Sequence, residues 1–205
     1  MSGGGTLTSP VLRQLTPADR GRIEALTRAV GVFRADEVPV ALEVFDGAVA
    51  GSPDYLALGA ELDGRLVGWI CWGPTPCTVG TFDLYWMAVD PATQGAGVGT
   101  ALIRAMEDRL RGLARLIIVE TAGRADYRPT RAIYEARGYH RAAVIPDFYA
   151  PGDDQLVYVK ALATGQPVAA TSNSGTTSDD TQRSTVGRGH GATAPLPPQP
   201  GIRRA

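Results

Sequence analysis

Three glycines between a strand pattern and a helix pattern constrain the fold of this chain more than any other segment. Residues 81–89 (TFDLYWMAV) alternate at the period of two that a strand imposes, which predicts a shared face for Phe82, Leu84, Trp86 and Ala88. Asp90-Pro91 ends the strand because proline donates no ladder hydrogen bond. The segment Gln94-Gly95-Ala96-Gly97-Val98-Gly99 then leads into a helical pattern. Free N–H groups at the start of a helix, and glycines that let a ligand approach the backbone, predict a phosphate-binding site.

Two nucleotide-binding loops of similar composition fit this segment less well. A triphosphate-binding loop ends in Gly-Lys-Ser/Thr, and the segment has no lysine. The dinucleotide pattern Gly-x-Gly-x-x-Gly matches Gly95 and Gly97, but its third glycine comes one residue early, at Gly99. The preceding strand also carries Asp83 and Tyr85, whereas a central parallel strand is usually apolar on both faces. A dinucleotide-dependent oxidoreductase is therefore the weaker alternative.

The pattern Gln/Arg-x-x-Gly-x-Gly/Ala, after a strand that ends in Val89-Asp90-Pro91, resembles the acetyl-coenzyme A motif of the GNAT superfamily of N-acetyltransferases. A second segment, residues 130–139 (TRAIYEARGY), resembles that family's motif A-x-x-x-Tyr-Glu-x-x-Gly-Phe. The two motifs stand in the family's order, and the resemblance covers residues 11–162. It implies an acyltransferase enzyme that uses acetyl-CoA as its acyl donor.

The remaining patterns predict alternating strands and helices over the same residues. Apolar residues at helical spacing over 98–113 place Leu113 inward and Glu107 toward solvent. Asp63-Gly64 is a strong signal for a type I′ hairpin. The other expected elements are strands at 11–15, 55–62, 65–72, 116–119, 139–145 and 155–162, and helices at 16–30, 36–45 and 130–137.

This order of elements, β-α-α-β-β-β-α-β-α-β-β, predicts an α/β fold (an α+β mixed sheet), and it is also the order of the GNAT fold. The connection of strand 81–89 through a helix to strand 116–119 implies that these two strands run parallel. The resemblance implies that they splay around acetyl-CoA, in a mostly antiparallel sheet of about seven strands flanked by about four helices.

Composition shifts along the chain predict one folded domain. We expect a flexible leader at residues 1–10, an N-acetyltransferase domain at 11–162, and a disordered tail at 163–205 that is rich in Thr, Ser, Gly and Pro. The hydrophobic fraction of 44% and charged fraction of 20% are those of a soluble globular protein.

Charge and composition also exclude several classes of partner. Of 20 basic and 21 acidic residues, the tail holds four arginines and two aspartates, which leaves 16 and 19 in the rest of the chain. This balance suits a cationic amine better than nucleic acid. Neither a signal peptide nor an apolar run of membrane-spanning length occurs, so we expect a cytoplasmic protein without a membrane partner. Two cysteines, Cys71 and Cys77, and two histidines predict ordinary thiols and no metal site.

The resemblance assigns acetyl-CoA to two segments. The loop and the first helical turn would bind its pyrophosphate through Gln94, Gly95, Gly97, Val98, Gly99 and Thr100. Met87, Ala88 and Val89 would lie beside the pantetheine arm, where family members carry a bulge whose backbone N–H groups can polarise the acetyl carbonyl. Family members often place an asparagine before the helix at 130–137, and here Thr130 or Arg131 would replace that contact.

Three residues are candidates for the proton transfers. Tyr134 matches the family's tyrosine that protonates the departing thiolate, and a neutral phenol can donate at any physiological pH. Asp83, six residues before Val89, stands where histone-type members carry a catalytic glutamate. Glu120 matches the glutamate of ribosomal-protein alanine acetyltransferases, and we favour it slightly as the general base. Asp83 and Glu120 could each instead be a solvated or helix-capping acid, and Tyr134 could instead be a core residue whose hydroxyl is hydrogen-bonded.

Candidates for acceptor binding are aromatic and acidic residues near the strand 81–89 and in the loop between the last two strands: Tyr85, Trp86, Asp147, Phe148, Tyr149, Asp153 and Asp154. Such side chains hold an ammonium group by cation–π and charge contacts, although Pro-Gly-Asp-Asp is also ordinary turn sequence. We expect the acceptor to be a primary amine of a small molecule or a peptide N-terminus, which attacks directly in a ternary complex. We expect a monomer or homodimer. The alternative function is a non-catalytic acyl-CoA-binding module.

Overall fold

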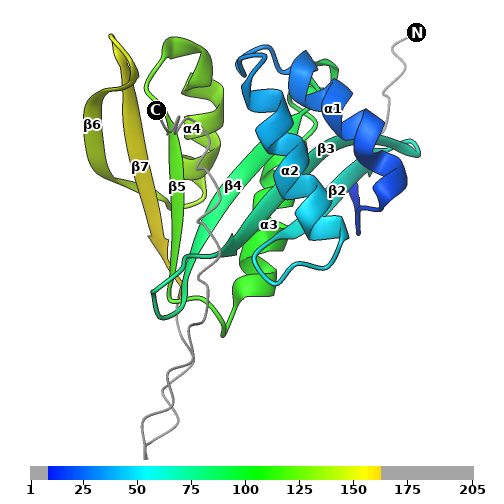
Figure 1. Cartoon of the computed structure of the whole chain (residues 1–205), viewed down its shortest axis with the longest axis horizontal. Coiled ribbons are helices and arrows are strands. Elements are labelled where there is room, and N and C mark those ends of the chain that lie inside the picture. Colours follow the sequence, from blue (N-terminus) through cyan, green and yellow to red (C-terminus); the bar gives the residue numbers. More distant parts are fainter. Residues whose placement is uncertain (1–8, 163–205) are drawn as a thin grey trace, which may run out of the picture.

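A computed structural model describes residues 9–162, and the tail predicted at 163–205 and most of the leader predicted at 1–10 lie outside these residues. Seven strands form one sheet in the order β1-β2-β3-β4-β5-β7-β6. Helices α1 and α2 cover one face of the sheet, and α3 and α4 cover the other (Figure 1). The bounds are β1 Val11–Arg13, α1 Arg20–Ala29, α2 Glu37–Val49, β2 Leu56–Leu62, β3 Arg65–Pro74, β4 Thr81–Val89, α3 Val98–Leu110, β5 Leu116–Ala122, α4 Arg128–Ala136, β6 His140–Ala150 and β7 Asp153–Ala161.

The predicted order of strands and helices and the mixed sheet are confirmed. The hairpin between β2 and β3 also has the predicted geometry, because Asp63 and Gly64 have φ of +50° and +73° and Leu62 pairs with Arg65 across the turn. Cys71 and Cys77 are free thiols, as expected. In the described part of the chain, no helix combines the length and the apolar character needed to cross a membrane.

β4 and β5 form a parallel ladder that covers only the first part of each strand. Residues 81–84 pair with residues 116–119, whereas β4 continues to Val89 and β5 to Ala122. Beyond Leu84 the two strands diverge, as Figure 1 shows. The predicted splay is therefore confirmed, and it leaves main-chain groups of residues 85–89 without a partner strand on the side toward β5.

A β-bulge in β4 changes which face its side chains occupy. The pairing with β3 shifts between Cys71 and Trp72, so Tyr85 is an extra residue in the ladder. Leu84, before the bulge, packs in the core with α3, whereas Trp86, after it, packs in the core with α1 and α2. The predicted shared face of these two residues is wrong, because the bulge interrupts the period of two.

Two side chains near α3 lie opposite to the prediction. Leu113 is 68% exposed because the helix ends at Leu110. Glu107, predicted to face solvent, is 3% exposed and accepts hydrogen bonds from the Arg137 guanidinium and, at 2.9 Å, from Lys160 Nζ. Glu107 thus links α3 to the end of α4 and to β7, and these contacts fix the position of α4 relative to the helix that follows the glycine loop.

The connection between the last two strands is shorter than predicted. β6 extends to Ala150 and β7 begins at Asp153, so Asp147, Phe148 and Tyr149 lie in β6 and not in a loop. The pairing of β6 with β7 is irregular between Ile145 and Ala150. This irregularity, which local sequence does not reveal, lets the strand continue through Pro146.

Replacing Glu107 with glutamine tests the link between α3, α4 and β7. The variant keeps the size of the side chain but leaves Arg137 and Lys160 without their counter-charge, so we expect the free energy of unfolding to fall by about 3 kcal/mol. Urea denaturation at pH 7 measures this loss. Asp108→Asn, on the exposed side of the same helix, is the control and should change the free energy of unfolding by less than about 0.5 kcal/mol. Equal losses in the two variants would contradict the role of Glu107.

Candidate active site

Asp90 holds the start of the glycine loop in place. Its carboxylate accepts a hydrogen bond from the Ala92 N–H at 3.0 Å and pairs with Arg22 of α1 at 2.8 Å and Arg65 of β3 at 2.9 Å. The Ala92 N–H, followed by the arginines, holds the pKa of Asp90 below its usual range. The sequence predicted only that Asp90-Pro91 ends the strand, and it did not reveal that Asp90 anchors the loop to two other elements.

The glycine loop presents free backbone donors to open space. Gly97, the N-cap of α3, has φ of +76°, and Gly95 has φ of +84°. The first helical hydrogen bond runs from the Ala101 N–H to the Gly97 carbonyl at 2.9 Å, so the N–H groups of residues 98–100 have no acceptor within the helix. A Cβ added to Gly95 or Gly97 would meet no atom within 4 Å. This arrangement fits the pyrophosphate of a coenzyme.

Other residues predicted to bind the cofactor differ in exposure. Gln94 and Thr100 are exposed beside the loop. The side chain of Val98 is buried in the core, so its backbone N–H is the group available to a ligand. At Gly99 a Cβ would lie 3.1 Å from Ile133 Cδ1, so this glycine lets α4 pack closely against α3.

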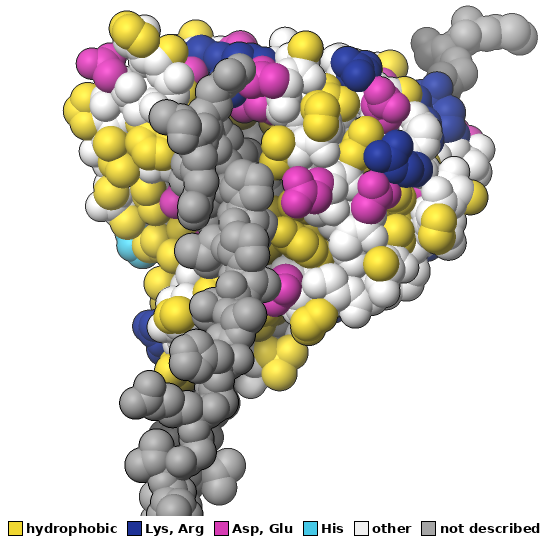
Figure 2. Space-filling view, in the orientation of Figure 1, with side chains coloured by type: hydrophobic (Ala, Val, Ile, Leu, Met, Phe, Trp, Pro, Cys, Tyr) yellow, Lys and Arg dark blue, Asp and Glu magenta, His cyan; other side chains and the backbone are white. Residues whose placement is uncertain are grey.

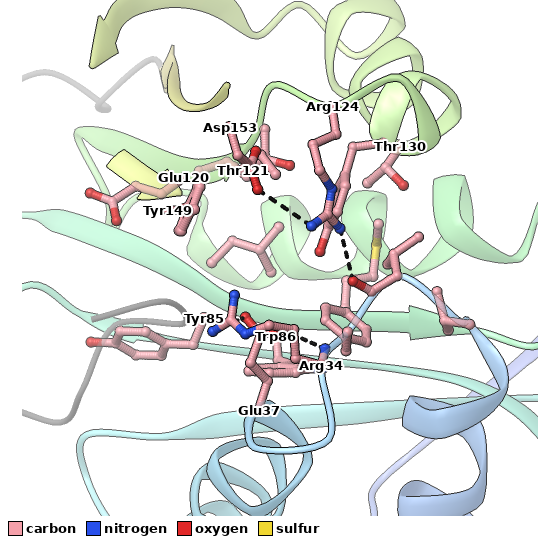
Figure 3. A pocket seen from close by; sticks show the side chains of 18 of the residues that line it. Arg34, Glu37, Tyr85, Trp86, Glu120, Thr121, Arg124, Thr130, Tyr149 and Asp153 are labelled. Carbon is pink, nitrogen blue, oxygen red and sulfur yellow. Dashed lines mark hydrogen bonds and ion pairs between the residues drawn. The ribbon is translucent and has the colours of Figure 1, made fainter. Parts of the chain in front are cut away.

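A cavity opens where β4 and β5 diverge. Its lining comes from the loop between α1 and α2, from β4 and β5, from the segment between β5 and α4, from α4 and from the hairpin of β6 and β7 (Figure 3). The lining residues are Val30, Val32, Phe33, Arg34, Glu37, Leu84, Tyr85, Trp86, Met87, Val119, Glu120, Thr121, Ala122, Arg124, Tyr127, Thr130, Tyr134, Tyr149 and Asp153.

Several predicted site residues meet in this cavity: Tyr85, Trp86, Met87, Glu120, Tyr134 and Tyr149, together with Thr130. Others do not line it. Ala88 is buried in the core with α1 and α2, and Val89 packs against the core with α3. Asp147 accepts a hydrogen bond from the Gly152 N–H at 2.6 Å in the hairpin turn. Phe148 is 36% exposed and packs edge-on against Tyr149.

Arg131, a candidate for replacing the family's asparagine, has a different place. Its Nη1 donates to the carbonyl of Ala122 at 2.7 Å and to that of Arg124 at 2.8 Å. The side chain therefore shapes the segment between β5 and α4. Thr130, the other candidate, lines the cavity and remains available for a ligand.

The two candidate carboxylates have different surroundings. Asp83 is 6% exposed, accepts a hydrogen bond from Thr75 Oγ1 at 2.8 Å and does not line the cavity. Glu120 is half-buried, lines the cavity and accepts a hydrogen bond from Gln155 Nε2 at 3.0 Å. Burial raises the pKa of Glu120 above its usual range, and the nearby charge of Asp83 raises it further. A carboxylate with a raised pKa is the stronger base. Burial raises the pKa of Asp83 as well, so it is the position in the cavity lining that distinguishes Glu120.

Tyr134 reaches the cavity from α4 as a buried phenol. It is 4% exposed and packs against the rings of Tyr139, at 5.9 Å between centroids, and Tyr158, at 6.2 Å. Burial raises the pKa of Tyr134 well above its usual value of 10. The hydroxyl therefore stays protonated at physiological pH and can donate a proton or a hydrogen bond into the cavity.

The cavity has three charged residues that the sequence did not single out: Arg34, Glu37 and Arg124. Asp153, a predicted acceptor-binding residue, also lines it, whereas Asp154 does not and accepts a hydrogen bond from the Asp147 N–H at 3.0 Å. Arg34 pairs with Asp36 and Glu37, and Arg124 pairs with Asp126 and Asp153. Figure 2 shows basic and acidic side chains gathered above the gap between β4 and β5. Glu120 forms no ion pair among residues 9–162, so it is the carboxylate of this lining whose charge is not compensated.

Aromatic side chains, including one further phenol, complete the lining of the cavity. Trp86 packs against Phe33 of the loop between α1 and α2, at 4.7 Å between ring centroids. Burial raises the pKa of Tyr149 to about 12, so this phenol also stays neutral. No group of three or more His, Cys, Asp or Glu side chains placed to hold a metal ion occurs in residues 9–162. The lining thus offers neutral phenols as hydrogen-bond donors, one uncompensated carboxylate and an aromatic wall.

Comparison with known proteins agrees with this geometry. The family model described as "Acetyltransferase (GNAT) family" matches residues 25–139, which include the glycine loop, Glu120 and Tyr134. The chain belongs to the GNAT family of acetyltransferases. It is an acyltransferase enzyme, and the predicted resemblance is confirmed.

Individual relatives of this acetyltransferase extend the comparison. An uncharacterized N-acetyltransferase of Methanocaldococcus jannaschii is 25% identical over 155 residues, which is 73% of this chain and 90% of that protein. The S-(2-succino)cysteine N-acetyltransferase of Bacillus subtilis is 33% identical over 87 residues, which is 40% of this chain and 53% of that protein. The crystal structure of a GNAT-family protein of Desulfovibrio desulfuricans superimposes with a TM-score of 0.71 at 36% identity, over 76% of this chain and all of that one.

Solved structures of the same fold include complexes with acetyl-CoA and with coenzyme A. A protein of Salmonella typhimurium with acetyl-CoA has a TM-score of 0.63 at 18% identity, over 80% of this chain and all of that one. An aminoglycoside 6'-N-acetyltransferase with coenzyme A has a TM-score of 0.61 at 16% identity, over 77% of this chain and 99% of that one. At these identities the likeness shows the shared fold.

Replacing Gly97 with alanine tests whether the glycine loop binds the coenzyme in addition to starting helix α3. A side chain at φ of +76° costs about 1–2 kcal/mol, and its Cβ would project into the open space where a phosphate would bind. We expect acetyl-CoA affinity, measured by calorimetry, to fall at least tenfold. Gly112→Ala is a matched control, because Gly112 has the same φ and the same open surroundings beyond the other end of α3. It should lose similar stability and keep its affinity, and equal losses of affinity would contradict the binding role of the loop.

Proposed function

We propose that this protein transfers the acetyl group of acetyl-CoA to a primary amine, which attacks the thioester directly in a ternary complex. One observation carries this proposal: Glu120 and Tyr134 line a single cavity between β4 and β5. The divergence of these two strands leaves main-chain donors of β4 unpaired, and the glycine loop with its free N–H groups follows the end of β4. The site thus combines a base, an acid and a place for the coenzyme.

The backbone would hold and polarise the donor. The N–H groups of residues 98–100, with Gly95 and Gly97, suit the pyrophosphate. Main-chain donors of residues 85–89 on the side toward β5 are free of the ladder, and one of them would bind the carbonyl oxygen of the acetyl group. Met87 lines the cavity next to these donors and would contact the pantetheine arm.

The acceptor amine determines how much a base contributes. An alkylammonium with a pKa near 10.4 must lose its proton at a cost of about 4–5 kcal/mol at pH 7, whereas an α-amine near 7.7–8.0 costs about 1 kcal/mol. Glu120 can take this proton because it lines the cavity and because burial brings its pKa closer to neutrality. Its uncompensated charge also attracts the ammonium form, and the rings of Tyr85 and Trp86 offer cation–π contacts.

The chemical step then balances as follows. The acceptor nitrogen bonds to the acetyl carbon, and the carbon–sulfur bond breaks. An acceptor that arrives as an ammonium ion first loses one proton to Glu120, which releases it to solvent. In the amide-forming step the nitrogen loses a second proton, and this proton balances the one that the leaving thiolate takes up, directly or through Tyr134. The products are the acetamide and free coenzyme A.

The acceptor is a primary amine of a small molecule or of a peptide N-terminus. The B. subtilis relative, whose name places an amino-acid derivative as its acceptor, supports the first class. The mildly acidic charge balance and the cavity's uncompensated Glu120 support a cationic amine in either class. The expected monomeric or homodimeric state and the cytoplasmic location stay predictions.

A thiol-release assay tests the proposed function. Purified protein and acetyl-CoA are mixed with panels of amino acids, polyamines, aminoglycosides and N-terminal peptides, and free thiol is measured. We expect release above the hydrolysis background with at least one amine panel. Tight acetyl-CoA binding by calorimetry without thiol release in any panel would instead support a non-catalytic acyl-CoA-binding module.

The phenol of Tyr134 should matter for turnover and not for coenzyme binding. We expect Tyr134→Phe to lower kcat at least tenfold, because the leaving thiolate loses its donor, while calorimetry shows nearly unchanged acetyl-CoA affinity. Tyr139→Phe is the control, because Tyr139 is buried in the same ring cluster but does not line the cavity. Unchanged kcat in Tyr134→Phe would remove this residue from the role of acid.

Glu120→Gln should weaken activity and strengthen the fold at neutral pH. Burial raises the pKa of Glu120 in the folded state above its pKa in the unfolded state. The ionised carboxylate therefore lowers the free energy of unfolding at high pH, and this loss disappears once the pH falls below the pKa of the unfolded state. We expect the variant to melt at an equal or higher temperature at pH 7. Its kcat/KM should fall at least tenfold, most for amines with pKa near 10, with loss of the acidic limb of the pH profile.

Asp83→Asn decides between the two carboxylates. We expect a smaller loss of kcat/KM than in Glu120→Gln, because Asp83 does not line the cavity. A larger loss in Asp83→Asn would assign the base to Asp83.

A further inference from the structure

The loop between α1 and α2 contacts both arms of the diverging strand pair. On one arm, the ring of Phe33 packs against Trp86 of β4 at 4.7 Å between centroids. On the other, the carbonyl of Val32 accepts a hydrogen bond at 3.0 Å from Nη2 of Arg124, which follows β5. All four residues line the cavity (Figure 3). The loop therefore spans the gap between the strands and forms one wall of the cavity.

Arg124 is held in this position by neighbours on two further segments. Its Nη1 donates to Asp153 Oδ2 at 3.3 Å, and Asp153 is the first residue of β7. Its Nε donates to Asp126 Oδ1 at 3.3 Å, and its guanidinium lies 5.3 Å from the ring centre of Tyr127. We name the contacts of Arg124 with Val32 and Asp153 the Arg124 bridge.

The Arg124 bridge compensates a buried charge. Asp153 is 6% exposed, and its second oxygen, Oδ1, is buried without a hydrogen-bond partner among residues 9–162. Arg124 is the cation that pairs with this carboxylate. Because an unpaired buried carboxylate is unfavourable, the pairing with Arg124 is costly to break, and through it Arg124 joins the loop between α1 and α2 to β7.

We propose that the Arg124 bridge makes the acceptor a free small amine and excludes polypeptide N-termini. This inference rests on the proposed function, and it chooses between the two acceptor classes. A polypeptide must place its first amine at Glu120 while the following residues, each about 3.3 Å long when extended, leave through an open groove. The bridge joins the loop between α1 and α2 to the first residue of β7, so it closes the wall of the cavity on that side to an extended chain. A small amine needs no such exit.

The charges of the lining agree with a small cationic acceptor. Arg34 and Arg124 already pair with carboxylates, so neither offers an uncompensated positive charge to an anionic substrate. Glu120 has no cationic partner among the described residues and would attract the ammonium group of the acceptor. A compact ammonium ion therefore matches the charge of the cavity.

Matched acceptors test the proposal in the wild-type enzyme. Thiol release is measured with free amino acids and alkylamines, and with pentapeptides that begin with the same amino acids. We expect kcat/KM for the best small amine to exceed that for the best peptide at least a hundredfold. Values within tenfold of each other, or a preference for peptides, would overturn the proposal.

A double variant, Arg124→Gln with Asp153→Asn, removes the bridge without leaving a buried unpaired charge. We expect the preference for small amines over peptides to fall at least tenfold, chiefly through a lower KM for peptides, because the wall that blocks the following residues is opened. Arg128→Gln is the control, because Arg128 is exposed in α4 and does not line the cavity, and it should keep the wild-type preference. An unchanged preference in the double variant would overturn the role of the bridge.

Amide hydrogen exchange tests the bridge independently of activity. We expect residues 30–36 to exchange at least tenfold faster in the double variant than in the wild type, and at the wild-type rate in Arg128→Gln. Unchanged exchange would overturn the bridge even if the enzyme is active. If no amine releases thiol, the proposed function fails, while faster exchange would still support the bridge. Should the double variant not fold, Arg124→Lys replaces it, since lysine keeps the charge beside Asp153 but cannot reach both partners, and it should raise the exchange in the same segment.

Discussion

The active site depends on the early end of one ladder, the parallel pairing of β4 with β5. Hydrogen bonds join the two strands only as far as Leu84 and Val119, and beyond that point the strands separate. Backbone groups that a longer ladder would have consumed are thereby left for a ligand, and the gap between the strands becomes the cavity. The bulge at Tyr85 adds to this effect, because it turns Trp86 toward the side of α1 and α2. Interrupted strand pairing therefore creates the place for both substrates.

Splayed strands need other contacts to hold their arms at a fixed separation, and paired charges provide them on both faces. Glu107 joins α3, α4 and β7 on one face, and the Arg124 bridge joins the loop of α1 and α2 to β7 on the other. Each includes a carboxylate that is largely buried, so each contact is costly to break. Charge pairing here sets geometry that neither the sheet nor the apolar core determines alone.

Local patterns predicted the parts of the site that lie within one segment of the chain. The glycine loop, the hairpin at Asp63-Gly64 and the helix that carries Tyr134 all follow from neighbouring residues. The family resemblance implied a bulge in this strand, but the residues themselves do not reveal the one at Tyr85, because the alternation on both sides of it looks regular in sequence.

Contacts between distant segments were missed for a different reason. Arg124 and Val32 are 92 positions apart, and Gln155 and Glu120 are 35 apart. No local pattern marks such residues, because only the assembled fold brings them together. The same limit applies to Glu107, whose helical position looked solvent-facing until β7 and the end of α4 covered it. Burial by distant elements thus reverses the expected role of a charged residue.

Burial raises the pKa of both Glu120 and Tyr134, but it favours the proposed role of only one of them. It raises the pKa of Glu120, which makes this carboxylate a better base, and it raises the pKa of Tyr134, which makes this phenol a weaker acid. A thiol with a pKa of about 8.5 lies below even an unperturbed tyrosine at about 10, so full proton transfer to the thiolate is unfavourable by at least about 2 kcal/mol. Tyr134 would therefore act chiefly by a hydrogen bond to the sulfur as its charge develops, which is strongest in a buried site. The removal of the amine's proton by Glu120, and not the protonation of sulfur, is then the step on which the pH dependence of the reaction rests.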